Sequence, residues 1–150
     1  MLYQTQNDPK WSKTLIKNSR MTIGGYGCAL TSVGNVIGKT PIEVMDMCKM
    51  PNGLVDWASI KTDVWKFKNR SNGFERQTLR EGVPSDNRVF IILIKYPASP
   101  TKFHWVAIES LGVGGYNCIN PYGNKSNPSQ AVKLFVPISD VIRHVEFIKL

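Results

Sequence analysis

The sequence lacks any long apolar stretch. Its longest uninterrupted apolar run is VFIILI at 89–94, far short of the roughly 18 residues that a membrane-spanning helix needs. The opening segment MLYQTQNDPKWSK has no basic region followed by an apolar one, so no secretory signal is visible. We therefore expect synthesis in the cytoplasm, with delivery by a virion or by lysis as one way out of the cell.

Cysteine and histidine are scarce. The three cysteines, Cys28, Cys48 and Cys118, are odd in number and widely spaced, and no CxxC or HxxxH pair occurs. Such a set does not form a disulfide framework, and a structural zinc site needs four grouped ligands. We expect no metal and no cofactor, and structural roles for Cys48 and Cys118. Since neither a disulfide framework nor a zinc site is expected, Cys28 has no metal-binding or disulfide role that would explain it.

Acidic residues are few beside the basic ones. The chain has 11 Asp and Glu against 19 Lys and Arg, a formal charge of +8 with an isoelectric point near 9.5. A basic surface suits an anionic partner such as nucleic acid, membrane headgroups or an anionic cell wall, although a lysine-rich surface can also have no such partner. The basic residues are scattered without a basic–aromatic repeat, which disfavours nucleic acid.

The length and composition fit one globular domain over 1–150, with 42% hydrophobic and 20% charged residues. A helix is predicted from Cys28, because Leu30, Val33 and Ile37 fall on one face, and Gly38 is expected to end it. A second helix starts at Thr40-Pro41, where Glu43 completes a capping box. A third is expected from Asp56, with an apolar stripe of Trp57, Ile60, Val64 and Phe67.

The second half of the chain changes to the period of β-strands. RVFIILIKY at 88–96 is typical of a central strand, and KFHWVAIESLG at 102–112 predicts a second one that ends in the turn GVGG. Further strands are expected at 116–120, 131–137 and 144–150, with a helical turn within 138–143. Helices first and an antiparallel sheet afterwards indicate the α+β class.

Cys28 follows a glycine-rich stretch, TIGGYG, and opens the first predicted helix. The free N–H groups and the dipole of a helix N-terminus favour a thiolate, which is the nucleophilic form of cysteine. Glycines permit a sharp turn and a close approach of the substrate backbone. Cys28 is therefore a candidate nucleophile, although a small buried residue after a loop has the same local sequence.

Two histidines compete for the role of base. His104 begins HWVAI, where the edge of a sheet could present it to the helix, and it could take the thiol proton and return it to a leaving amine. A surface histidine at a strand end is the alternative. His144 lies in a late strand, and nothing in the sequence around it indicates a site.

Two amides could complete the site. Asn120 in CINPYG could accept a hydrogen bond from the other ring nitrogen of His104, although Asn-Pro is also a common start of a turn. Gln6 in QNDPKW could donate its side-chain NH₂ to an oxyanion beside the backbone N–H of Cys28. Gln4 is a nearby competitor for that role.

Four segments together resemble the papain-like cysteine peptidases of the bacteriocin-processing, double-glycine-leader type. They are QNDPKW, TIGGYGCALTSVGNVIG, HWVAI and INPYG. The family opens with Gln-x-Asp-x-x-Trp and carries Thr-Ile-Gly-x-x-Gly-Cys before a helix, then His-Trp/Tyr-Val and Asp-Pro. The resemblance implies a papain-like fold, with N-terminal helices packed on a C-terminal antiparallel β-sheet. It implies Cys28 as nucleophile, His104 as base, Asn120 as the orienting group in place of the more usual Asp, and Gln6 in the oxyanion hole.

The resemblance implies a cysteine peptidase that hydrolyses an amide through a thioester. A free-standing basic domain suits peptide bonds of peptidoglycan in the cell wall, as in a phage or bacterial protein, better than leader processing on a transporter. A transglutaminase-like acyl transferase would use the same thioester. A catalytically inactive binding or structural module, for example in a virion, is the alternative outside enzymes. Trp105, next to His104, could border the cleft.

Overall fold

The computed structural model describes residues 1–72 and 84–150, with only the backbone of residues 71 and 72. The helices come first in the chain. They are α1 (Ile23–Tyr26), α2 (Cys28–Ile37) and α3 (Pro41–Met47), followed by the 3₁₀ turns η1 (Pro51–Gly53) and η2 (Trp57–Ser59). The strands are β1 (Trp65–Asn72), β2 (Arg88–Lys95), β3 (Phe103–Gly112), β4 (Gly115–Asn120), β5 (Val132–Pro137) and β6 (Val141–Lys149), with the 3₁₀ turn η3 (Ile138–Asp140) before β6.

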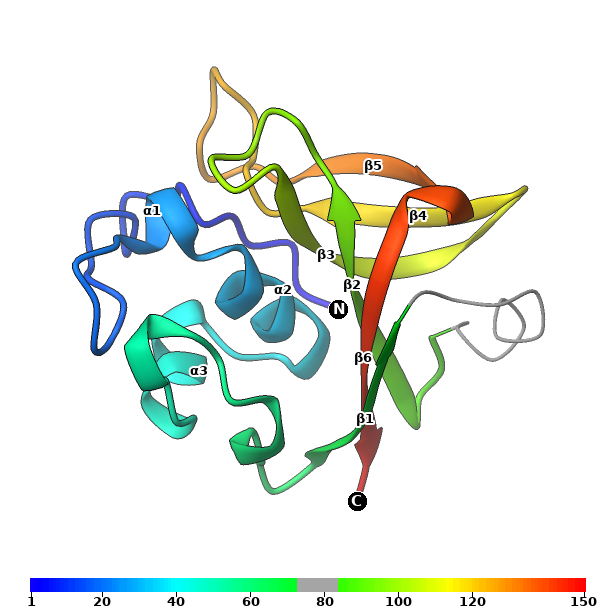
Figure 1. Cartoon of the computed structure of the whole chain (residues 1–150), viewed down its shortest axis with the longest axis horizontal. Helices are drawn as coiled ribbons and strands as arrows, with labels where there is room; N and C mark the ends of the chain where they lie inside the picture. The colour runs from blue at the N-terminus through cyan, green and yellow to red at the C-terminus, as the bar shows by residue number, and fades with distance from the viewer. Residues whose placement is uncertain (73–83) are drawn as a thin grey trace.

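The strands form one sheet in the order β1-β6-β2-β3-β4-β5, and every pair is antiparallel. The helices gather on one side of this sheet, while β4 and β5 lie across its upper part (Figure 1). The α+β class predicted from the sequence is confirmed. The strand at 88–96 is indeed central, because β2 lies between β6 and β3.

The first two predicted helices are confirmed together with their ends. Leu30, Val33 and Ile37 are all buried along α2. Gly38 ends α2 in the left-handed region at φ 77°, where a residue without a Cβ is favoured. Thr40 and Glu43 form the reciprocal capping box that begins α3.

The third predicted helix is wrong. Only the 3₁₀ turn η2 forms at Trp57–Ser59, and the chain is already extended in β1 from Trp65. Trp57 and Ile60 are buried as expected, but Val64 is exposed and Phe67 lies in the strand. The spacing of apolar residues after position 64 is that of a strand, because half-buried Trp65 and Phe67 alternate with exposed lysines.

Two apolar clusters cover the two faces of the sheet. The helix-side core joins α2 and α3 to residues on one face of the strands, including Val89, Ile91, Ala107, Val145 and Phe147. The far-side core contains the residues that alternate with them: Phe90, Ile92, Ile94, Val106, Ile108, Tyr116, Cys118, Val136 and Val141. Because successive strand residues point to opposite faces, this alternation decides which side chains can meet the helices.

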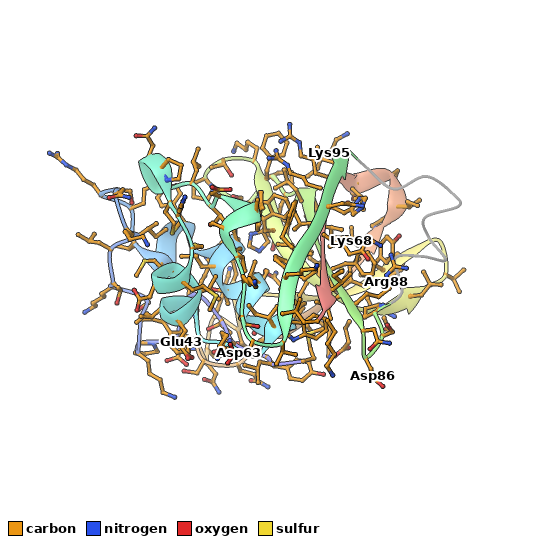
Figure 2. All side chains as sticks on the ribbon, turned by 90° about the horizontal axis from the view of Figure 1, so that it is seen from below. Glu43, Asp63, Lys68, Asp86, Arg88 and Lys95 are labelled. Atoms are coloured by element: carbon orange, nitrogen blue, oxygen red, sulfur yellow. The ribbon has the colours of Figure 1, made fainter. Side chains whose placement is uncertain are left out.

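An ion cluster joins the strands at one edge of the sheet. The Glu146 carboxylate of β6 is buried, and the guanidinium of Arg88 in β2 donates to it at 2.9 Å. Lys68 of β1 lies 3.6 Å from the same carboxylate oxygen. Figure 2 shows Lys68 and Arg88 on this side of the molecule. The cluster matches the charge of a buried carboxylate with two cations from neighbouring strands, which offsets the cost of its burial.

Candidate active site

Cys28 is the first residue of α2, but the stretch before it differs from the expected open turn. Gly24 and Gly25 belong to the one-turn helix α1, whose start is capped by the Thr22 hydroxyl. Gly27 separates the two helices with φ −84°, an angle that any residue can adopt. The glycines are therefore not needed for left-handed backbone angles.

Close packing explains two of these glycines instead. A Cβ on Gly27 would lie 2.5 Å from the carbonyl oxygen of Ile23, and one on Gly24 would lie 2.8 Å from that of Ser12. Both distances are shorter than real Cβ contacts, so a side chain at either position would displace backbone. The two glycines let α1 pack tightly against its own chain, and this packing fixes where α2 and Cys28 begin.

The Cys28 side chain is only partly exposed. Burial raises the pKa of the thiol, and this effect exceeds the lowering by the nearby backbone N–H groups of Trp105, Ala29 and Cys28 itself. The helix N-terminus thus acts in the direction expected from the sequence, since two of these N–H groups belong to the first turn of α2. Among the described residues, no cation offsets this rise in the pKa of the thiol.

His104 is the second residue of β3 and is completely buried. The expectation that a sheet edge presents it is wrong, because β3 is an inner strand between β2 and β4. It lies at the end of the strand and pairs with Ile94. Its ring therefore faces the end of the far-side core, while Cys28 approaches β3 from the helix side. The sulfur lies near the backbone N–H of Trp105, the residue after His104.

Asn120, the last residue of β4, contacts the imidazole directly. Its Oδ1 lies 2.9 Å from Nε2 of His104. The backbone N–H of Tyr122 donates to the same oxygen at 3.0 Å, which fixes the orientation of the amide because its NH₂ group would repel that N–H. Oδ1 is therefore the acceptor and Nε2 carries the proton. Nδ1 of His104 must then be the bare nitrogen that can accept a proton.

That bare nitrogen is buried and has no hydrogen-bond partner within the described part of the chain. A buried acceptor left unpaired is costly, and such groups are rare in native structures. No hydrogen bond between described residues joins Nδ1 to Cys28. The structure thus brings His104 and Asn120 together. It places Cys28 near Trp105, the residue that follows His104 in β3.

Two tyrosines that the sequence analysis did not single out hold the imidazole. The ring of Tyr122 stacks on that of His104 at 4.2 Å between centroids, and Tyr96 stacks on it at 4.9 Å. The Nδ2 group of Asn120 also donates to the Tyr96 hydroxyl at 3.3 Å. Tyr122 lies two residues after Asn120, the last residue of β4, and its contact with His104 is not visible from residue type alone. These contacts restrict rotation of the ring.

The pKa of His104 is lowered to about 4, because burial disfavours the imidazolium more than the hydrogen bond to Asn120 favours it. Burial therefore disfavours each charge separately, on Cys28 and on His104.

Gln6 is also completely buried, between the two halves of the site. Its backbone N–H donates to the carbonyl of Pro121 at 2.7 Å, and its Nε2 donates to the carbonyl of Gly24 at 3.0 Å. Its Oε1 has no partner among the described residues. Since an NH₂ group has two donors, one remains available. Gln6 thus links the segment after Asn120 to the helix before Cys28.

Gln4 and His144, the alternatives to Gln6 and His104, lie away from these residues. Gln4 donates its Nε2 to the carbonyl of Lys39, which follows α2 at the end opposite to Cys28. His144 lies in β6 opposite Ile92, with its ring near that of Phe90. Cys48 and Cys118 are buried free thiols that contact backbone carbonyls of Met45 and Tyr116.

Two cavities adjoin the candidate residues. A cavity of about 390 Å³, here called the Cys28 cavity, has walls that include Cys28, Leu54, Trp57, Trp105, Arg70 and Arg143. A second, the tyrosine cavity, has walls that include Gly24, Gly25, Tyr96, Asn120 and Tyr122. Trp105 borders the first of them, as the sequence suggested.

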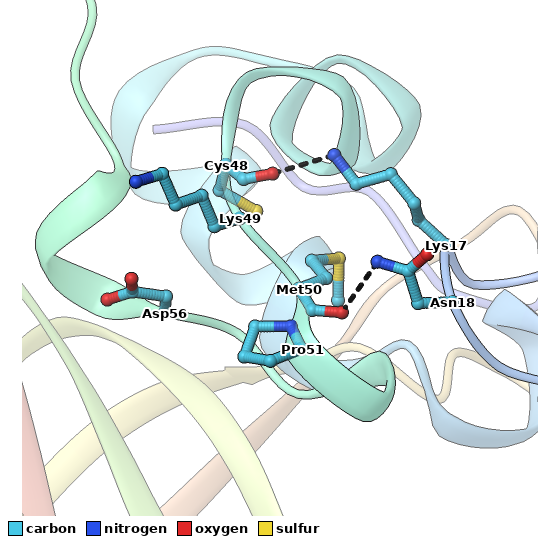
Figure 3. Close-up of a pocket in the computed structure, with 7 residues that line it drawn as sticks. All are labelled: Lys17, Asn18, Cys48, Lys49, Met50, Pro51 and Asp56. Atoms are coloured by element: carbon cyan, nitrogen blue, oxygen red, sulfur yellow. Dashed lines mark hydrogen bonds between the residues drawn. The ribbon is translucent and has the colours of Figure 1, made fainter.

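A further cavity lies between the N-terminal loop and the segment after α3. It is lined by Lys17, Asn18, Cys48, Lys49, Met50, Pro51 and Asp56 (Figure 3). Two of its polar side chains already have structural partners: Lys17 donates to the carbonyl of Cys48 at 2.7 Å, and Asn18 donates to that of Met50 at 3.1 Å. These bonds tie the loop to the end of α3, and none of the candidate catalytic residues takes part.

Among the described residues, no group of three or more His, Cys, Asp and Glu is placed to hold a metal ion. No helix in 1–72 or 84–150 has the length and apolar character to cross a membrane. Comparison of the chain with protein-family models, with curated proteins and with solved structures gave no match.

Proposed function

We propose that this chain is a cysteine peptidase with a papain-like arrangement, in which Cys28 attacks an amide carbonyl and His104 acts as the base. The observation that carries the proposal is the hydrogen bond from Nε2 of His104 to Asn120, which leaves Nδ1 bare, buried and unpaired. A neutral imidazole in this tautomer is prepared to receive one proton. Cys28 opens α2, and its sulfur lies near the backbone N–H of Trp105, the residue after His104.

The reaction would proceed in two halves. The Cys28 sulfur bonds to the carbonyl carbon while its proton passes to Nδ1 of His104, and the C–N bond then breaks as that proton moves to the leaving amine. The carbonyl oxygen becomes negative in between, where the N–H of Cys28 and the free donor of Gln6 can stabilise it. Water, activated by the same imidazole, then hydrolyses the thioester. No metal or cofactor enters this scheme.

Asn120 would hold the ring without adding a charge. Its amide accepts from Nε2 in both protonation states of His104. The imidazolium is therefore stabilised mostly by the thiolate itself. We expect a pair that is neutral at rest and becomes charged as an electrophilic carbonyl reaches the sulfur.

The low pKa of His104 and the raised pKa of Cys28 favour a second candidate function. A chain with the same fold that no longer catalyses, and that acts as a binding or structural module, would also keep both groups neutral. The two candidates differ in whether His104 controls the reactivity of Cys28.

The test is the rate of alkylation by iodoacetamide as a function of pH, followed for each cysteine by peptide mass spectrometry. Cys48 and Cys118 serve as internal controls, since they are 3% and 0% exposed. We expect Cys28 to react fastest and to lose about 100-fold in rate near pH 7 in His104→Ala, as general-base contributions usually do. An unchanged Cys28 rate in His104→Ala would favour the binding module.

For the substrate, we propose peptide bonds of the bacterial cell wall, because the charge of +8 suits a wall that carries anionic polymers. The assay is release of new amino groups from purified peptidoglycan, with Cys28→Ser as the inactive control. An acyl transferase would instead join the acyl group to an added amine, which the mass of the product distinguishes from hydrolysis.

A further inference from the structure

We propose that the Cys28 cavity binds the acyl part of the substrate and selects a carboxylate in it, through Arg70 and Arg143. The inference rests on the proposed function and adds the class of substrate. The occupant would be an extended peptide with an apolar residue and, beside it, an acidic residue two or three positions before the scissile bond.

The position of the base decides which cavity receives which half of the substrate. His104 would protonate the leaving amine, and the groups that touch its ring, Tyr96, Tyr122 and Asn120, line the tyrosine cavity. The leaving group therefore belongs there. The acyl group stays bonded to the sulfur, and the sulfur lies in the wall of the other cavity.

The Cys28 cavity is largely apolar near the sulfur. Trp57 and Trp105 pack against each other at 4.8 Å between ring centroids, and Leu54, exposed at 67%, lies at its rim. An exposed leucine next to two tryptophans suits an apolar side chain of a ligand, which would remove that surface from water.

Two arginines line the same cavity at a distance that the strand register defines. Arg143 of β6 is opposite Leu93 of β2, and Leu93 is opposite Trp105 of β3. Two strand spacings of about 4.8 Å place Arg143 about 10 Å across the sheet from Trp105. The Cys28 sulfur lies near the N–H of Trp105. An extended peptide covers this span with about three residues, at roughly 3.3 Å each.

Arg70 reinforces Arg143 from the next strand. Arg70 is opposite Val145, two residues from Arg143 in β6, so both arginines lie on the same face as diagonal neighbours. Neither has an ion pair with another described residue, whereas Lys68, Arg88 and Lys133 do. No described residue in the wall of the cavity is acidic. Two guanidinium groups that have no ion pair within the described part of the chain, beside an apolar wall, are complementary to a carboxylate.

The test compares two probes that differ only in this charge. They are acetyl-Glu-Leu-Gly chloromethyl ketone and its Gln-Leu-Gly counterpart, in which the Cys28 sulfur displaces chloride to form a thioether. The quantity measured is the second-order rate of Cys28 labelling, by mass spectrometry of the intact protein. We expect the Glu probe to react about 10-fold faster, as charge-assisted hydrogen bonds are the stronger kind.

The variant Arg70→Gln Arg143→Gln should bring that ratio close to 1, because the carboxylate that distinguishes the two probes then has no cation from these strands beside it. The control is Lys39→Gln Lys149→Gln, which removes two positive charges as well, one beyond the far end of α2 and one at the end of β6 away from Arg143. This control should keep the ratio of wild type. Comparison of the arginine variant with the lysine control separates a local effect in the cavity from the general attraction of a basic protein for an anion.

Equal rates of the two probes in wild type would overturn the inference, as would a ratio that persists without the two arginines. Either result leaves the proposed function in place if Cys28 alkylation still depends on His104. If that dependence is also missing, the proposed function fails and the substrate class fails with it.

Discussion

The His104 imidazole is held on several sides by groups that do not carry charge. Asn120 accepts from one nitrogen, and Tyr96 and Tyr122 stack on the ring. The consequence is a strongly lowered pKa, because no anion compensates a proton in this buried place.

The first prediction concerns the group that orients the ring. In Asn120→Asp, a carboxylate would lie next to Nε2, and an opposite charge at that distance raises the pKa of an imidazole by about 1–3 units. The pKa of His104 should rise from about 4 toward 6, measured by NMR titration of the ring protons. Alkylation of Cys28 at pH 6 should become faster. A pKa that stays near its wild-type value would contradict the assigned contact.

The second concerns stability and pH. Between pH 6.5 and about 4 the unfolded chain binds a proton at His104 while the native protein does not. The free energy of unfolding should therefore fall as the pH drops through this window, by about 3 kcal/mol for the full shift. Urea unfolding at pH 7 and pH 4.5 measures this loss. His104→Gln should show a smaller decrease over the same range, and an equal decrease would refute the neutral, buried histidine.

At the scale of elements, the close junction of α1 and α2 sets the position of Cys28, the proposed nucleophile. Gly27 permits this junction because a Cβ there would lie 2.5 Å from the backbone oxygen of Ile23. Gly25 is a useful contrast in the same helix, since the nearest atom to its Cβ would be the Thr22 hydroxyl at 3.3 Å.

Gly27→Ala should therefore destabilise the protein by about 1–3 kcal/mol, as overpacking does. It should also lower the His104-dependent reactivity of Cys28 by up to about 100-fold, because small displacements at a reacting atom have large effects. Gly25→Ala should change both quantities little. Thermal unfolding and the alkylation assay measure the two effects, and similar behaviour of the two variants would exclude the packing explanation.

At the scale of the whole molecule, the charge of +8 is expected to act on association. Binding to purified cell walls that carry anionic polymers should decrease several-fold as NaCl is raised from 0.05 M to 0.3 M, because salt shortens the range of the attraction to below about 10 Å. Cosedimentation measures the bound fraction. Walls stripped of these polymers should bind weakly at every salt concentration.

The same titration with duplex DNA tests the nucleic-acid alternative. Contacts to several phosphates would give a steep dependence of affinity on salt. We expect weak binding without sequence preference. Tight binding to DNA, together with salt-insensitive binding to walls, would replace the cell-wall proposal.

The sequence by itself determined the elements whose signals are local. The apolar face of α2, the αL position at Gly38, the Thr40–Glu43 capping box and the five strands after residue 84 all depend on neighbours along the chain. Local patterns misassigned 56–67, where one apolar stripe fits both a helix and a 3₁₀ turn followed by a strand. Pairing of β1 with β6 at the opposite end of the chain decides for the strand.

The candidate site shows the same division. Residue types and order suggested Cys28, His104, Asn120 and Gln6 as candidates, and the structure places His104 in contact with Asn120. Only the tertiary structure decided that Tyr96 and Tyr122 hold the ring, that Nδ1 is the bare nitrogen, and that Arg70 and Arg143 share a cavity with the thiol. It also decided the pKa shifts, because burial depends on which distant segments cover a group and not on its neighbours in the chain.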